Sequence, residues 1–152
     1  MAGAVIFAYD GSDLAKAAIA EAGRQLAPGR DALVVTVWQP VNVGFRTSVP
    51  IHAQDAEEVG KAAELTAVEG TSLAAAAGFN ARGLAVEAAP TWKGVVDAAD
   101  EHDASLIVLG SHGHTGLGSV LLGSVATAVT HHSQRAVLIV HRTAWPGSES
   151  GA

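Results

Sequence analysis

The chain has 152 residues, of which 49% are hydrophobic and 16% charged, and it contains no cysteine. This length is typical of one domain, and the composition excludes an intrinsically disordered protein. The missing cysteines exclude disulfides, thiolate metal sites and cysteine nucleophiles.

Nine Lys plus Arg stand against fifteen Asp plus Glu, giving a formal net charge of −6. The basic residues are scattered singly, so no nucleic-acid surface is predicted. No apolar run reaches the ~18 residues of a membrane span, and no basic segment precedes the first apolar run as in a signal peptide. We expect one cytoplasmic domain over residues 1–142 and a disordered tail over residues 143–152.

In the first half of the chain, short apolar runs alternate with helical patterns. Residues 4–9 form a continuous apolar run, typical of a strand buried on both faces. Ser12 is a candidate N-cap for a helix that ends at Pro28-Gly29. A second strand is predicted over residues 32–38, and residues 39–52 form a long loop of the kind that is usually functional or mobile.

The second half continues the alternation. A long helix is predicted over residues 53–77, with an apolar side formed by Leu65, Val68, Leu73 and Ala76, although Gly70 interrupts its pattern. Further strands are predicted over residues 81–88, 105–109 and 136–141. Further helices are predicted over residues 93–102 and across Leu121, Val125 and His132. This order predicts parallel strands joined by right-handed crossovers, in a three-layer α/β/α sandwich.

Ligands of open parallel sheets bind beyond the carboxyl ends of the strands. The glycine-rich residues 110–124 follow the fourth strand, and Asp10 follows the first. Glycines before a helix let backbone N–H groups approach an anion, and the helix N-terminus adds a positive dipole end. Ser124 is a candidate for the helix cap or for a phosphate contact, and Asp10 for a ribose hydroxyl or Mg²⁺. The alternative is that these glycines only make tight turns.

Three familiar motifs are absent. Gly118-x4-Gly123 has the spacing of a P-loop, but Ser124 stands where the lysine belongs. Gly116-x-Gly118 is followed by Leu121 rather than by the third glycine of a dinucleotide fingerprint. The chain also has no Gly-x-Ser-x-Gly nucleophile elbow.

Gly110-x2-Gly113-x9-Gly123-Ser124 resembles the ATP-binding signature Gly-x2-Gly-x9-Gly-[Ser/Thr] of the universal stress protein family. AVIFAYDGS and SLIVLGSHGHTGLGSVLLGSVATAVTHHSQRAVLIVH resemble further parts of that family, so the resemblance spans residues 4–141. It implies a five-stranded parallel sheet of order 3-2-1-4-5, with ATP bound between the first and fourth strands. The chain departs from the family at Ala88, where many members have glycine, and at Ala136, which replaces a proline.

The same resemblance implies a set of ligand contacts. Ala8 and Asp10 would lie beside the ribose and phosphates, with Mg²⁺ at Asp10, and the backbone of Val37 would contact adenine. The phosphates would be surrounded by Gly110, Ser111, His112, Gly113, His114, Thr115, Gly116, Gly123, Ser124 and Val125. His112 and His114 are candidate phosphate donors, and Trp38 is a candidate to cover the adenine.

Three functions follow from these observations. The first is an ATP-dependent regulator in the stress response, whose nucleotide state is read by an unknown protein partner. The second is a slow ATPase, because no activated nucleophile or carboxylate pair is evident. The third is a dimeric scaffold with a vestigial nucleotide site.

The last strand predicts self-association. Val137, Leu138, Ile139 and Val140 form an uncharged apolar run at what the strand order makes a sheet edge. Such an edge promotes aggregation unless it is covered, and pairing about a twofold axis covers it with its own copy. We therefore expect a homodimer through this strand.

Overall fold

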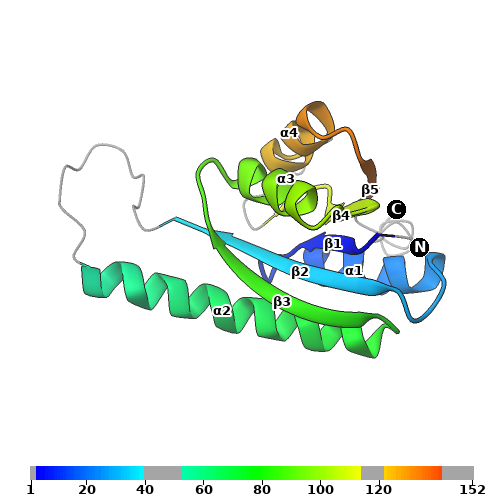
Figure 1. Cartoon of the computed structure of the whole chain (residues 1–152), viewed down its shortest axis with the longest axis horizontal. Coiled ribbons are helices and arrows are strands. Elements are labelled where there is room, and N and C mark those ends of the chain that lie inside the picture. The colour runs from blue at the N-terminus through cyan, green and yellow to red at the C-terminus, as the bar shows by residue number, and fades with distance from the viewer. Residues whose placement is uncertain (1–2, 40–52, 114–121, 142–152) are drawn as a thin grey trace, which may run out of the picture.

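The protein is an α/β/α sandwich built on one parallel sheet (Figure 1). The computed structural model describes residues 3–39, 53–113 and 122–141. Its strands are β1 (Val5–Ala8), β2 (Asp31–Trp38), β3 (Asn80–Glu87), β4 (Leu106–Gly110) and β5 (Ala136–Val140). Its helices are α1 (Asp13–Gln25), α2 (Ala53–Ala76), α3 (Thr91–Glu101) and α4 (Ser124–His132). The strand order β3-β2-β1-β4-β5 confirms the predicted fold class and order.

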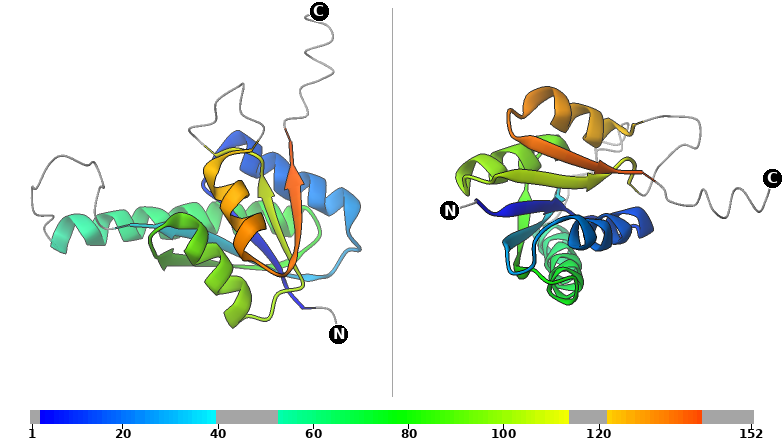
Figure 2. Two further views of the ribbon diagram at one scale, coloured as in Figure 1. Left: turned by 90° about the horizontal axis from the view of Figure 1, so that it is seen from above. Right: turned by 90° about the vertical axis from the view of Figure 1, so that its right-hand side faces the viewer.

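The helices cover both faces of the sheet, α1 and α2 on one and α3 and α4 on the other (Figure 2). Successive side chains of a strand point to opposite faces. Val5 and Phe7 of β1 therefore pack into the core under α1 and α2, and Ile6 packs into the core under α3 and α4. The continuous apolar strands predicted from the sequence are explained by this burial on both faces.

The turn after β1 connects this strand to α1. Gly11 has a φ of +82°, a left-handed conformation that favours glycine. Ser12 is the N-cap, as predicted, and its Oγ accepts a hydrogen bond from the Ala15 N–H at 3.2 Å. The helix ends at Gln25 with Leu26 as its C-cap, slightly before the predicted Pro28-Gly29 stop.

Helix α2 runs without interruption, but its predicted apolar side was wrong except at Leu73, which packs against the core. The side chains of Leu65 and Val68 are 72% and 60% exposed. The buried side consists of small residues: Ala63, Ala67, Gly70 and Ala74. A Cβ on Gly70 would lie 2.7 Å from Tyr9 Cδ2 and from Val34 Cγ1, so the helix approaches the sheet too closely at this position for a larger side chain.

The second half of the fold follows the predicted order with small shifts at element ends. Helix α3 begins at Thr91, after a cis Ala89-Pro90 bond. Trp92 of α3 stacks on His132 of α4, with ring centroids 4.0 Å apart. Gly123 is the N-cap of α4 and Ser124 is its first residue, so of the two roles considered for Ser124, cap or phosphate contact, the cap is wrong.

Some predictions concern residues outside the described ranges: the loop over residues 39–52 beyond its first residue, Leu121, and the tail over residues 143–152. Within the described part of the chain, no helix combines the length and apolar character needed to cross a bilayer.

Candidate functional site

A cavity of about 490 Å³ lies at the carboxyl ends of β1, β2 and β4, beside the N-terminal ends of α3 and α4. Its volume falls in the range typical of small-molecule sites, about 300–1,000 Å³. It spans the point where the strand order reverses between β1 and β4, which is where open α/β sheets bind ligands.

The structure brings the described residues of the predicted set together around this cavity: Ala8, Asp10, Val37, Gly110, Ser111, His112, Gly113, Gly123, Ser124 and Val125. His114, Thr115 and Gly116 lie outside the described residues. The lining also contains residues that sequence reasoning missed: Tyr9, Ala15, Val35, Thr91, Val95, Leu109, Leu122 and Ala126. Strand alternation offered a signal for Val35, two positions before Val37 on the same strand face.

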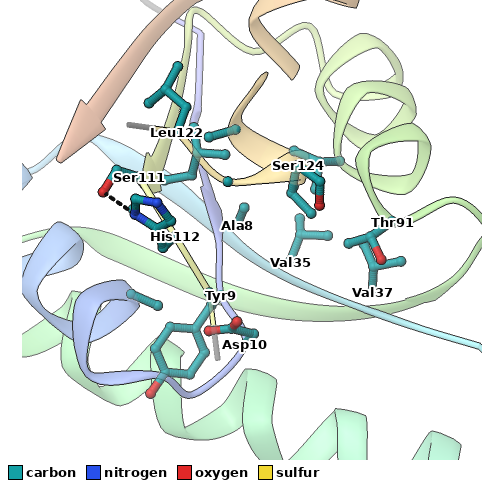
Figure 3. A pocket seen from close by; sticks show the side chains of 18 residues that line it. Ala8, Tyr9, Asp10, Val35, Val37, Thr91, Ser111, His112, Leu122 and Ser124 are labelled. Carbon is teal, nitrogen blue, oxygen red and sulfur yellow. Dashed lines mark hydrogen bonds between the residues drawn. The ribbon is translucent and has the colours of Figure 1, made fainter. Parts of the chain in front are cut away.

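One end of the cavity is apolar. Val35 and Val37 of β2 lie there beside Thr91, the first residue of α3 (Figure 3). A Cβ on Gly94 would lie 2.8 Å from Val37 Cγ2, so this glycine lets α3 close directly over the strand. The arrangement offers a flat aromatic ligand an apolar surface with one hydroxyl at its edge.

Trp38 does not cover this end, and that expectation was wrong. Trp38 follows Val37 and points to the opposite face of the sheet. Its indole Cζ2 lies 3.1 Å from where a Cβ on Gly60 would stand, so the ring packs on α2.

The opposite end of the cavity carries hydrogen-bonding groups. Ser111 Oγ and His112 Nδ1 lie 3.1 Å apart (Figure 3). The other imidazole nitrogen, Nε2 of His112, is buried and has no hydrogen-bond partner among the described residues. Gly123 donates its N–H to Ser111 O at 2.6 Å and caps α4 without a side chain. Because the first N–H groups of a helix have no partner within it, this end of the cavity suits an anion.

Asp10 stands next to this polar end of the cavity. Its Oδ1 accepts a hydrogen bond from the Ser12 N–H at 2.9 Å. A Cβ on Gly113 would lie 2.6 Å from Asp10 Oδ2, so the glycine allows the carboxylate to sit against the loop after β4. Asp10 therefore links the two sides of the cavity. No group of three or more His, Asp or Glu side chains within residues 3–39, 53–113 and 122–141 is arranged to hold a metal ion.

Tyr9, which directly follows β1, fixes the end of this strand through hydrogen bonds to α2 and β2. Its hydroxyl donates to Glu69 Oε1 of α2, and its carbonyl accepts from Thr36 Oγ1 at 2.9 Å. Burial raises the pKa of the phenol well above its ordinary value, and the hydrogen bond and negative charge of Glu69 raise it further. In Figure 3 the hydroxyl points away from Ala8 and Val35, so this group holds the strand end in place.

The strand order and the cavity at its reversal define a doubly wound α/β protein with a cavity at the switch point, the place where such sheets bind ligands. The sequence model of the Universal stress protein family matches residues 1–141. The chain belongs to this family.

Two relatives show how far the sequence similarity extends. A universal stress protein encoded in the QAH/OAS sulfhydrylase 3' region of Thermus aquaticus is 34% identical over 143 residues, covering 90% of this chain and 96% of that one. Universal stress protein Sll1388 of Synechocystis is 54% identical, but over 44 residues, which is 29% of each chain.

Solved structures show the same fold. MJ0577 of Methanocaldococcus jannaschii superposes with a TM-score of 0.76 at 22% identity, covering 94% of this chain and 98% of that one. A universal stress protein in complex with cAMP superposes with a TM-score of 0.63 at 28% identity, covering 91% and 97% of the two chains.

Proposed function

We propose that this protein is a nucleotide-dependent regulator that binds ATP in the cavity at the β1–β4 reversal. The purine would lie at the apolar end, beside Val37 and Thr91, and the phosphates at the polar end, beside His112 and Gly123. A change in nucleotide occupancy would alter a surface that a protein partner recognises.

The observation that carries this proposal is the buried Nε2 of His112, which has no partner among the described residues, in the same cavity as the start of α4, which has no side-chain cap. A buried polar nitrogen without a partner is unfavourable, and a phosphate oxygen would satisfy it. An apolar slot joined to anion donors is the pattern expected for a nucleotide, which is itself apolar at one end and anionic at the other.

Magnesium fits the same proposal. Mg²⁺ usually keeps several water ligands and is bound by one or two carboxylates together with substrate phosphates. Asp10 is the one carboxylate among the described residues that line the cavity. It would hold Mg²⁺ together with the ATP phosphates, and the ion would offset repulsion between Asp10 and the ligand.

The lining residues favour binding over catalysis. Ser111 is only 2% exposed, so its hydroxyl is not accessible as a nucleophile. Any ATP hydrolysis would depend on positioning of the phosphates by the loop and by Mg²⁺, and should be slow. A turnover above ~1 per second, typical of enzymes, would contradict this part of the proposal.

A cyclic or monophosphate nucleotide is a second candidate ligand. The structure of a universal stress protein in complex with cAMP supports it. The two ligands make different demands on the polar end of the cavity, because cAMP brings one phosphate and no triphosphate chain.

Thermal denaturation and nucleotide analysis would test both ligands. We expect ATP to copurify with the protein, to be released by acid and to be identified by its mass.

A ligand at 100 times its Kd stabilises the fold by about 2.7 kcal/mol, a shift of several degrees in Tm. We expect this shift with ATP and Mg²⁺ and a much smaller one with AMP or cAMP. Equal melting curves in ATP, AMP, cAMP and buffer would contradict the proposal, and a shift with cAMP alone would favour the second ligand.

The proposal includes a homodimer through β5. This strand pairs with β4 alone among the described strands, and no described strand pairs with its other edge. Its central residues Val137, Leu138 and Ile139 are half-buried, and its partner in the dimer would be the same strand of a second copy.

A further inference from the structure

Ser111 is fixed at the polar end of the cavity by its own backbone. Its N–H donates to Val140 O of β5 at 2.9 Å, and its carbonyl accepts from the Gly123 N–H at 2.6 Å. The residue is buried, so its hydroxyl has little freedom to turn toward solvent.

The hydroxyl of Ser111 lies 3.1 Å from Nδ1 of His112 (Figure 3). A serine hydroxyl can donate or accept, whereas a neutral imidazole carries a proton on only one of its two nitrogens. When Ser111 donates to Nδ1, the proton of the neutral ring must be on Nε2. In that arrangement the hydroxyl would stabilise the tautomer in which Nε2 is a hydrogen-bond donor.

The Nε2 end of the ring lies where the cavity meets α4. Ring carbon Cδ2, which is bonded to Nε2, is 3.6 Å from the position of a Cβ on Gly123. Nε2 itself is buried without a partner among the described residues. An N–H at this atom would donate to a ligand oxygen that reaches it beside the first turn of α4, where helix geometry favours anions.

We propose that Ser111 is a positioning residue, whose hydroxyl holds His112 as an Nε2–H donor for a phosphate oxygen of the bound nucleotide. This inference rests on the proposed function. It changes the role that the family resemblance implies for Ser111: its hydroxyl acts through His112 and not on the phosphate directly. The same two side chains form no nucleophile and base, because the Ser111 hydroxyl is buried and cannot attack a substrate.

The first test needs no ligand. Nitrogen-15 NMR of the histidine side chains, at about pH 8.5 where an ordinary imidazole is neutral, distinguishes the two tautomers. The chain has seven histidines, and the signals of His112 are those that disappear in His112→Gln. We expect the Nε2–H tautomer in the wild type and a mixture in Ser111→Ala. A wild-type ring protonated on Nδ1, or an unchanged tautomer in Ser111→Ala, would overturn the proposal.

The second test compares ligands with and without phosphate by calorimetry. Losing one hydrogen bond of ordinary strength lowers affinity about three- to tenfold. We expect Ser111→Ala to weaken ATP and AMP by this factor and to leave adenosine within about twofold. An equal loss for adenosine would show a general structural role and overturn the proposal.

Two substitutions of His112 provide the matched control. The amide nitrogen of Gln reaches roughly as far as Nε2, and that of Asn roughly as far as Nδ1. We expect His112→Gln to keep most phosphate affinity and His112→Asn to lose about tenfold or more. In the His112→Gln background, Ser111→Ala should have no further effect, because the tautomer is gone. An effect there equal to that in the wild type would overturn the proposal.

The two tests separate this inference from the proposed function. If the wild type binds no nucleotide, the proposed function fails, and the tautomer measurement still decides whether Ser111 controls His112. If the wild type binds ATP and Ser111→Ala binds it equally well, the inference fails and the proposed function stands.

Discussion

At the scale of single residues, the contact between Asp10 and Gly113 ties the two sides of the cavity together. The sequence indicated that a glycine was needed at position 113 for the turn or for the phosphates. The structure adds a different reason, because a Cβ there would stand 2.6 Å from Asp10 Oδ2. The acidic turn after β1 and the loop after β4 therefore constrain one another.

Gly113→Ala tests this contact. The added methyl group should displace the Asp10 carboxylate and weaken binding of ATP with Mg²⁺ about tenfold, the effect of losing a charged hydrogen-bonding group. Asp10→Ala should weaken binding to a similar extent, and the double substitution should be no worse than Asp10→Ala alone. Calorimetric titration measures all three variants. A folded Gly113→Ala protein that binds as tightly as the wild type would contradict the prediction.

Tyr9 gives a second prediction at this scale, because it is the chain's one tyrosine. Its raised pKa, caused first by burial and then by Glu69, means that the folded protein keeps the phenol protonated where the unfolded chain ionises, above about pH 10. The folded state then binds more protons than the unfolded state, so the free energy of unfolding should fall as the pH rises above about 10.

Ultraviolet difference absorbance of tyrosinate measures this ionisation directly. We expect no tyrosinate signal in the folded protein at pH values where a denatured control is fully ionised. Tyr9→Phe should reduce the alkaline loss of stability, because one of the responsible groups is gone. A tyrosinate signal with the ordinary midpoint near pH 10 would contradict the assignment.

At the scale of helices and strands, the strands and the order of elements were predictable because they depend on local signals. Buried parallel strands are continuous apolar runs, and Ser12 precedes a helix with its hydroxyl in the capping position. The orientation of α2 was not predictable in this way. An apolar pattern of Leu65 and Val68 indicated one side, and close packing by Ala and Gly selected another.

The candidate site was likewise predictable where it depends on local sequence signals and not where it depends on packing between distant elements. Glycine spacing after β4 identified the polar end, because the motif is contiguous with the strand that positions it. Thr91 and Val95 were missed because α3 is distant in sequence, and only the folding of α3 over β2 brings them to the cavity. Trp38 was misplaced although strand alternation gave the signal, because a residue next to Val37 on the same strand points to the opposite face.

Gly70→Ala tests the packing of α2. Alanine is normally favoured over glycine inside a helix by about 1 kcal/mol. Here the added Cβ meets Tyr9 and Val34 at 2.7 Å, and overpacking costs about 1–3 kcal/mol. We expect a net loss of stability in urea denaturation, together with a higher exposure of Tyr9. Ser72→Ala, at an exposed position of the same helix, is the control and should be neutral or slightly stabilising. A stabilised Gly70→Ala protein would show that α2 can move away without cost.

At the scale of the whole molecule, β5 and β3 are the two edges of the sheet. If β5 pairs with itself, Leu138→Asp or Ile139→Asp should shift the protein from dimer to monomer, because a charge would be brought against its own copy. Leu84→Asp, at a half-buried position on the β3 edge, is the control for general destabilisation and should leave the dimer intact. Light scattering at tens of micromolar measures the mass, and circular dichroism checks folding. A monomeric wild type would contradict the prediction, and a dimer that survives both β5 substitutions would place the interface elsewhere.

The reversal of strand order also determines where the two halves of the chain meet. Strand β1 pairs with β4 only over Val5–Phe7 and Leu106–Val108, whereas β2 and β3 pair along their whole lengths. The cavity lies directly beyond this short seam and takes its walls from both halves. A nucleotide bound there would contact both halves. Its binding and release would therefore change how rigidly the two halves are held together. The signal passed to a partner would then be stiffness across the seam, carried without a large change of shape.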